Sequence, residues 1–180
     1  MTAKTEVAVF GGGCFWCTEA VFSAMTGVLA VKSGYCGGHV QQPTYEQVCT
    51  KLTGHIEVVQ IEFDPALVSY PELLEVFFAT HDPTTPGRQG NDVGPQYQSA
   101  IFVQSDAQKS AAEEAIKAID ASGRFAEPVC TQLLPAATFW PAEDMHDDYF
   151  ALHPEQSYCQ FVIAPKVSKF KKQFSDKLKS

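Results

Sequence analysis

Two thiols and two large aromatic rings stand close together in the stretch GGGCFWCTEAVF at residues 11–22. The apolar spacing after the glycines predicts a helix, and Cys14 lies where the glycine turn passes into it. Unpaired amides and the positive end of the helix dipole favour a thiolate there, so Cys14 is a candidate nucleophile. The alternative is a buried structural cysteine, but the three glycines indicate a need for close backbone approach.

Phe15 and Trp16 follow the candidate nucleophile directly. Aromatic side chains belong more often to a core than to a ligand pocket. Their position beside a thiol favours a pocket, because two aromatic faces suit a methyl group or a polarised, sulfonium-like sulfur. The residues alone leave both interpretations open.

Cys14 and Cys17 together form a C-x-x-C motif, which has three interpretations: a redox pair, half of a zinc site, or one active thiol with a neighbour. A structural zinc site needs four ligands, and the sequence contains no second C-x-x-C motif. We therefore expect no metal and no cofactor. A thiol–disulfide oxidoreductase and a small zinc or thiol-switch binding module remain as competing functions.

Glu57 begins the segment EVVQIEFDP at residues 57–65, which alternates as a strand does. Val59, Ile61 and Phe63 form the set predicted to face the core, and Glu57 has the same parity. Burial raises the pKa of a carboxyl group and keeps its proton on near neutral pH, as a general acid requires. The alternative is a glutamate at the end of a strand that reaches solvent.

Polar residues in two long irregular segments, 34–55 and 81–98, supply further candidates. Long loops in a compact domain are often functional. Tyr45, Asp92 and Tyr97 could hydrogen-bond to a polar ligand there. Each of them taken alone is equally compatible with a turn or a surface position.

The remaining pattern alternates strands with helices. Strands are predicted at 7–10, 27–35, 57–65, 99–104 and 129–134, and helices after the first glycine turn, at 69–81 and at 105–121. Such elements bury one face of a sheet against helices. We expect an α+β protein, a two-layer α/β sandwich with a ferredoxin-like βαββαβ core, long loops and a C-terminal wrap.

Length and composition bound the organisation. The 180 residues, 45% of them hydrophobic, predict one catalytic domain over 1–180, with an α/β core at 5–140 and a C-terminal wrap at 141–180. The net charge of −8 argues against nucleic-acid binding. The sequence shows no secretory leader and no long apolar run, so we expect a cytoplasmic monomer that does not bind a membrane, with its six cysteines largely unbridged.

Five segments together resemble the A-type methionine sulfoxide reductases, the peptide-methionine (S)-S-oxide reductase family. The segments are GGGCFWCTEAVF, GYCGGHVQQPTYEQVC, TGHIEVVQIEFDP, HDPTTPGRQGNDVGPQYQSAIF and PAEDMHDDYF, in that order along the chain. The resemblance implies that Cys14 is the nucleophile and Glu57 the proton donor. It further implies that Phe15 and Trp16 bind the substrate methyl group, and that polar contacts to substrate come from Tyr45, Asp92 and Tyr97.

The resemblance also implies a reaction cycle. Cys14 attacks the sulfur of an S-epimer methionine sulfoxide, free or in a protein, and becomes a sulfenic acid. A second thiol then forms a disulfide with it, and thioredoxin reduces that disulfide. Cys159, in the segment HPEQSYC, matches the tail position of a resolving cysteine. Cys17 is the alternative resolving thiol, although a first helical turn constrains the geometry of a bridge.

Overall fold

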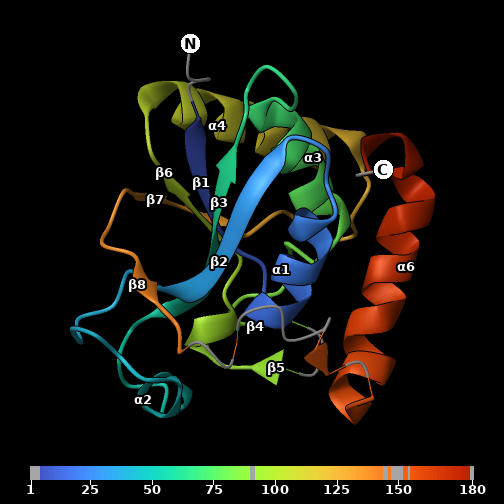
Figure 1. Ribbon diagram of the computed structural model, residues 1–180. Helices are drawn as coiled ribbons and strands as arrows, with labels where there is room; N and C mark the ends of the chain where they lie inside the picture. The colour runs from blue at the N-terminus through green and yellow to red at the C-terminus, as the bar shows by residue number, and fades with distance from the viewer. Residues whose placement is uncertain (1–4, 90–91, 144–145, 147–151, 154, 179–180) are drawn as a thin grey trace.

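The computed structural model describes residues 5–89, 92–143, 146, 152–153 and 155–178 (Figure 1). Its centre is a six-stranded sheet in the order β7-β6-β1-β3-β2-β8. The strands are β1 (Glu6–Gly11), β2 (Val28–Cys36), β3 (Ile56–Phe63), β6 (Ala100–Val103), β7 (Gln132–Pro135) and β8 (Trp140–Pro141). Only the β6–β7 pair is parallel among the described strand pairs of this sheet. The expected mixed α/β architecture is therefore confirmed.

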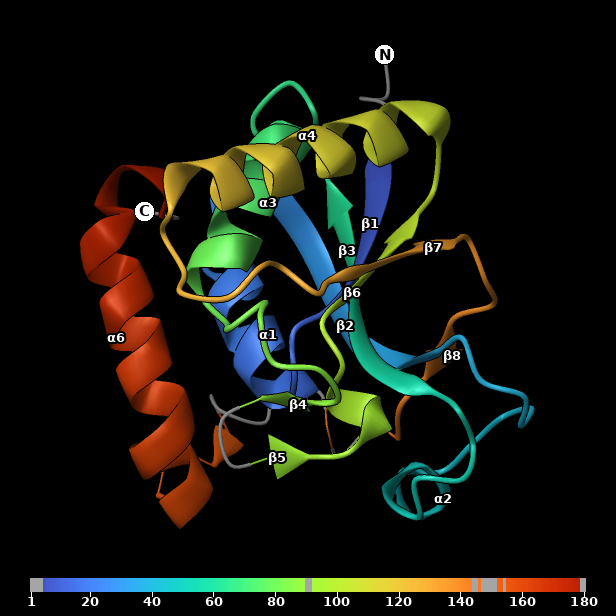
Figure 2. The ribbon, with the colours of Figure 1, turned by 180° about the vertical axis from the view of Figure 1, so that it is seen from behind.

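Helices α1 (Phe15–Ser23) and α3 (Tyr70–Ala79) pack on one face of the sheet, while α4 (Asp106–Ser122) lies against α3 and β6 at one end of it (Figure 2). Helix α6 (Ala164–Gln173) runs beside α1, so the C-terminal segment covers the outer side of that helix. None of the described helices is long and apolar enough to cross a membrane.

The capping residues recognised in the sequence set the starts of α3 and α4. The Ser69 hydroxyl accepts a hydrogen bond from the Glu72 amide, and the Glu72 carboxylate accepts one from the Ser69 amide, which is the predicted capping box of α3. Ser105 caps α4 through the Gln108 amide. The Gln108 side chain instead bonds to the backbone of Gln104 and Val7, which ties α4 to β1.

The two long loops contain more structure than their sequences suggest. The first holds α2 (Tyr45–Cys49), which a Thr44–Gln47 capping box begins. The second holds a small hairpin of β4 (Arg88–Gln89) and β5 (Asp92–Val93), followed by the 3-10 turn η1 (Pro95–Tyr97). The strand predicted at 129–134 is β7, which begins later, at Gln132. The C-terminal segment holds the π-helical stretch η3 (Cys159–Ile163) before α6 and the 3-10 turn η4 (Ser175–Lys177) after it.

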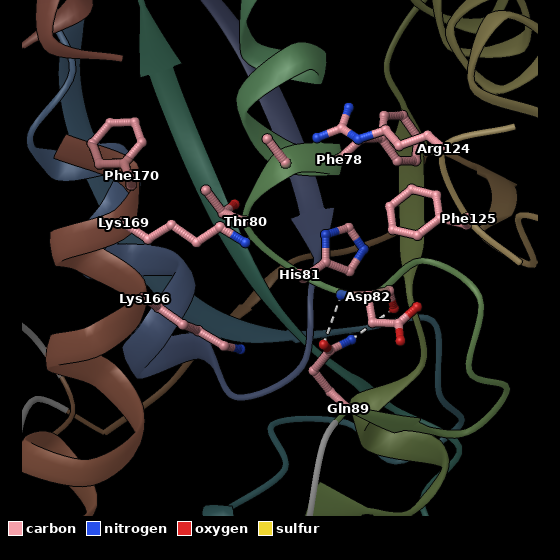
Figure 3. A pocket seen from close by; sticks show the side chains of 11 residues that line it. Phe78, Thr80, His81, Asp82, Gln89, Arg124, Phe125, Lys166, Lys169 and Phe170 are labelled. Carbon is pink, nitrogen blue, oxygen red and sulfur yellow. Dashed lines mark hydrogen bonds between the residues drawn. The ribbon is translucent and has the colours of Figure 1, made fainter. Parts of the chain in front are cut away.

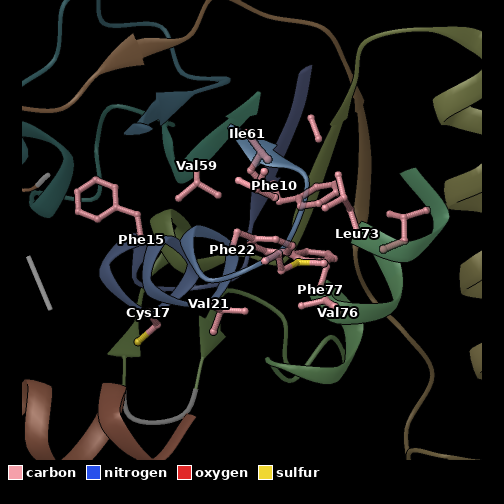
Figure 4. Close-up of a cluster of buried hydrophobic side chains, with 14 of the residues drawn as sticks. Phe10, Phe15, Cys17, Val21, Phe22, Val59, Ile61, Leu73, Val76 and Phe77 are labelled. Atoms are coloured by element: carbon pink, nitrogen blue, oxygen red, sulfur yellow. The ribbon is translucent and has the colours of Figure 1, made fainter. Parts of the chain in front are cut away.

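The main core lies between the sheet and the helices α1 and α3 (Figure 4). Phe10 of β1 stacks on Phe77 of α3 with ring centroids 4.8 Å apart and lies 5.6 Å from Phe22 of α1. On the opposite face of the sheet, Val58 is also buried. Phe139 packs on the cluster that contains Val58, because the chain between β7 and β8 passes over that face.

Phe22→Ala tests how far α1 depends on this core. Phe22 is fully buried, so its truncation leaves a cavity and should lower the free energy of unfolding by about 3–5 kcal/mol. Phe161→Ala is the matched control, because Phe161 is 77% exposed and its loss should change stability by about 0.5 kcal/mol or less. Urea denaturation measures both, and equal effects of the two substitutions would contradict the packing described.

Candidate active site

Neighbouring side chains pack closely on the glycine turn before α1. Gly13 has a φ of +95°, in the left-handed region that favours glycine, and a Cβ there would lie 2.6 Å from the Gln89 side chain. A Cβ on Gly12 would approach the Phe77 ring at 3.2 Å. The sequence predicted close approach at these glycines, and the groups that approach are Gln89 of the β4–β5 hairpin and α3.

Cys14 is the N-cap residue of α1 and is 7% exposed. The expected stabilisation of its thiolate by free amides is not observed in this structure. The Cys17 amide donates to the Cys14 carbonyl, and the Phe15 amide donates to Glu57. Burial raises the pKa of the Cys14 thiol well above its ordinary value, and the hydrogen bond with Cys17 adds to this. Cys14 is therefore protonated in the substrate-free site.

Cys17 lies one helical turn beyond Cys14, and each thiol shifts the pKa of the other. Interaction with the Cys14 thiol lowers the pKa of Cys17, and the positive charge of Lys166 on α6 lowers it further. The effect opposes burial, which by itself would raise the pKa of a thiol. The second thiol of the motif is thus the one whose surroundings favour the thiolate.

Glu57 of β3 lies beneath the start of α1, as its parity predicted, and is 1% exposed. Its Oε1 accepts the Phe15 amide at 3.2 Å, and its Oε2 is buried without a hydrogen-bond partner among the described residues. Burial is the main cause that raises the pKa of Glu57 to about 8, and the charge of Asp92 contributes. The carboxyl group is therefore largely protonated at neutral pH.

Aromatic rings surround the N-terminus of α1. Trp16 donates from Nε1 to Nδ1 of His146 at 3.1 Å, and the two rings stack with centroids 5.7 Å apart. Tyr45, the first residue of α2, meets His146 edge-on at 4.6 Å and lies 6.2 Å from Phe15. The expected pair of aromatic side chains thus becomes a group of four, drawn from three separate segments.

The polar residues predicted from the two long loops lie in the same site as Cys14 and Glu57. Asp92 of β5 accepts a hydrogen bond from the Tyr158 hydroxyl at 2.6 Å. Burial raises the pKa of Tyr97 in η1, and the charges of Glu57 and Cys14 add to the increase. Burial also raises the pKa of Tyr45, with Glu57 as the next cause. The structure therefore brings Tyr45, Asp92 and Tyr97 together with Glu57 and Cys14.

Tyr158 and His146 are site residues that the sequence reasoning missed. The Tyr158 hydroxyl donates to Asp92, and its proximity lowers the pKa of both Cys14 and Cys17. Both residues lie in segments that carry the resemblance or adjoin Cys159, which is the signal that could have identified them. Cys159 itself follows Tyr158 at the start of η3, and its side chain lies outside the described part of the chain.

Glu143 attaches the C-terminal segment to the site from the other side. It accepts the Tyr45 amide through both carboxylate oxygens, at 3.2 and 3.1 Å, and the Tyr35 hydroxyl at 3.3 Å. These bonds fix α2 against β2. Within the described ranges, no three histidine, cysteine or carboxylate side chains gather as a metal site would require.

The buried Glu57 predicts a pH-dependent stability. Its pKa is about 8 when folded against an ordinary 4.5, so the folded chain binds this proton more tightly and the stability from it is lost as pH rises through that interval. Glu57→Gln removes the effect. The stability of this variant relative to wild type should therefore rise by roughly 3 kcal/mol between about pH 5 and pH 8.

Urea denaturation across this pH range measures the difference. Glu62→Gln is the matched control, because Glu62 lies on the same strand but is exposed, and its pH profile should follow that of wild type. Parallel profiles for Glu57→Gln and wild type would show that Glu57 is not a buried, neutral carboxyl group.

Comparison with known proteins places this chain in a family. A family model described as peptide methionine sulfoxide reductase matches residues 6–178. The MsrA protein of Ralstonia nicotianae is 55% identical, covering 97% of this chain and 94% of its own.

Two solved structures with similar folds support this assignment. Methionine sulfoxide reductase A of Corynebacterium diphtheriae is 34% identical with a TM-score of 0.79, covering 85% of this chain and 77% of its own. Reduced Mxr1 of Saccharomyces cerevisiae is 29% identical with a TM-score of 0.80, covering 88% of this chain and 91% of its own. The chain therefore belongs to the peptide methionine sulfoxide reductase family and is an oxidoreductase.

Proposed function

We propose that this protein reduces the S epimer of methionine sulfoxide, free or in oxidised proteins, through a sulfenic acid on Cys14. The observation that carries the proposal is Glu57, a buried and largely protonated carboxyl group that contacts the residue next to Cys14. An oxide leaves a sulfur atom readily only when it receives a proton. Thiol–disulfide exchange, the competing function, has no such requirement.

The two carboxyl oxygens of Glu57 are proposed to have different roles. Oε1 is occupied by the Phe15 amide, so the proton is assigned to Oε2, which is free to donate to a sulfoxide oxygen. Cys14 sulfur attacks the substrate sulfur and forms an S–S bond, Glu57 protonates the oxygen, and the Cys14 thiol proton passes to the carboxylate. The hydroxyl group then moves from the substrate sulfur to the Cys14 sulfur, the S–S bond breaks with its electron pair on the substrate sulfur, and methionine leaves. The net step moves one oxygen from methionine sulfur to cysteine sulfur, which reduces the substrate by two electrons and oxidises Cys14 by two.

The aromatic group is proposed to bind the substrate methyl. Phe15, Trp16 and Tyr45 present apolar faces beside Cys14, and such faces suit a methyl group on a polarised sulfur. His146 fixes the Trp16 ring through its hydrogen bond. Tyr45, Asp92 and Tyr97 are proposed as the polar contacts to substrate. The Tyr158 hydroxyl now bonds to Asp92, so this hydrogen bond is proposed to break when Asp92 contacts the substrate.

The contacts favour Cys17 as the thiol that attacks the sulfenic acid. It lies one helical turn from Cys14, its amide donates to the Cys14 carbonyl, and its pKa is lowered by interaction with the Cys14 thiol. Condensation forms the Cys14–Cys17 disulfide and releases water. Cys159, the first choice from the sequence, remains the alternative, because its backbone follows Tyr158, which contacts both thiols.

A dithiol protein is proposed to reduce this disulfide by exchange, and thioredoxin is the expected donor. One solved structure of Saccharomyces cerevisiae Mxr1, 21% identical with a TM-score of 0.56, is a complex of that protein with Trx2. Residues 1–180 are proposed to form one catalytic domain. The strand order β6-β1-β3-β2 supports the ferredoxin-like description of its core, and the contacts of Glu143, His146 and Tyr158 support a wrap at 141–180 that completes the site.

Single-turnover reduction without added reductant tests this account. Wild type should release one methionine per enzyme from the S epimer and none from the R epimer, while Cys14→Ser should release none. Glu57→Gln should slow the release by about 10²–10⁴-fold, because a positioned acid contributes that much. Methionine released by Cys14→Ser at the wild-type level would contradict the assignment of the nucleophile.

Disulfide mapping by mass spectrometry after one turnover identifies the resolving thiol. We expect a Cys14–Cys17 bridge in wild type and in Cys159→Ser. In Cys17→Ser, methionine release should continue while the bridge to Cys17 is lost. A Cys14–Cys159 bridge in wild type, absent from Cys159→Ser, would instead assign the resolving role to the C-terminal cysteine.

A further inference from the structure

A cavity lies between the segment that follows α3 and one face of α6 (Figure 3). Its volume of about 380 Å³ falls within the range of about 300–1,000 Å³ typical of ligand pockets. The walls are the end of α3 with His81 and Asp82, the Gln89 side chain that packs on Gly13, residues 124–125, and one face of α6. No step of the proposed reaction uses this cavity.

Three cations border the cavity. Lys166 and Lys169 extend from α6 toward His81, and Arg124 lies on the opposite wall (Figure 3). None of the three forms an ion pair with any described residue. Lys166 and Lys169 are three residues apart on one helix, where like charges repel and destabilise. A chain with a net charge of −8 has thus collected unpaired positive charge at one cavity.

The other polar groups of the cavity do not neutralise these cations. Asp82 is the one carboxylate in its lining, and one of its oxygens accepts from the Thr84 amide and hydroxyl. The Gln89 side chain is held by the backbone of Asp82. His81 bonds to the Phe77 carbonyl and the Ser99 hydroxyl, and burial lowers its pKa to about 4, so it is neutral. Three positive charges against one negative charge leave the lining with a charge of +2.

We propose that this cavity binds a phosphate group, either as inorganic phosphate or as a phosphate monoester. A dianion balances the charge of the lining, and an arginine fork with two ammonium groups is the donor set that phosphate oxygens prefer. The Phe125 ring, which lies 5.5 Å from the Arg124 guanidinium, offers an apolar surface for the organic part of an ester.

Occupancy of this site would act on the redox pair through Lys166. The charge of Lys166 favours the thiolate of Cys17, so a bound dianion beside it would disfavour that thiolate and slow disulfide formation. This consequence rests on the proposed function. The binding itself does not, and a binding measurement therefore separates failure of the site from failure of the catalytic account.

Isothermal titration with inorganic phosphate and with phenyl phosphate, at one ionic strength set with chloride, tests the site. We expect a Kd below about 1 mM for the wild-type chain. The double variant Lys166→Met/Lys169→Met should bind at least tenfold more weakly. The matched control is Lys171→Met/Lys172→Met, which removes the same charge from exposed positions of the same helix and should bind as wild type does.

The comparison of ligands identifies the source of the phosphate. Tighter binding of phenyl phosphate, with the preference lost in Phe125→Ala, would assign the site to a monoester, and equal affinities would assign it to inorganic phosphate. Equal weakening in both double variants would reveal only diffuse attraction to lysines, and absence of binding by wild type would remove the site. Either result overturns the proposal, provided that the unfolding midpoints show all variants to be folded.

Discussion

The hydrogen bond from the Phe15 amide to Glu57 is the contact on which the site depends. It joins the first turn of α1 to the middle strand pair of the sheet and requires a buried carboxyl group on a strand whose neighbouring residues, Ile56 and Val58, are buried and apolar. Burial of an ionised carboxylate is costly, and protonation avoids that cost. The position that anchors the helix is therefore also the position at which an acid keeps its proton near neutral pH. Both the anchoring of α1 and the proposed proton transfer therefore require a buried carboxyl group at Glu57.

The C-terminal segment supplies residues that complete the site around the start of α1. Glu143 holds α2 and Tyr35, His146 orients Trp16, and Tyr158 bonds to Asp92 and lowers the pKa of Cys14. Helix α6 then packs beside α1 and places Lys166 near Cys17. The residues that tune the site therefore lie more than a hundred positions from the thiols that they influence.

Local patterns predicted the local features well. Alternation placed Glu57 with the buried side chains of β3, and the Ser69–Glu72 spacing located α3. Non-local contacts were beyond such patterns. The sequence suggested a stabilised thiolate on Cys14, but the Phe15 amide is taken by a residue 42 positions away. The partners of Trp16 and Asp92 come from the C-terminal segment, and periodicity does not encode which distant side chain fills a gap. The Thr44–Gln47 capping box was a local signal that could have revealed α2.

Infrared difference spectroscopy of wild type against Glu57→Gln measures the central claim most directly, because a protonated carboxyl group has its own C=O stretching band. The account predicts that this band is present in the substrate-free wild-type chain at neutral pH, is absent from the variant, and fades as pH rises through about 8. A difference spectrum without the band at neutral pH, or a band that disappears near the ordinary pKa of 4.5, would contradict it.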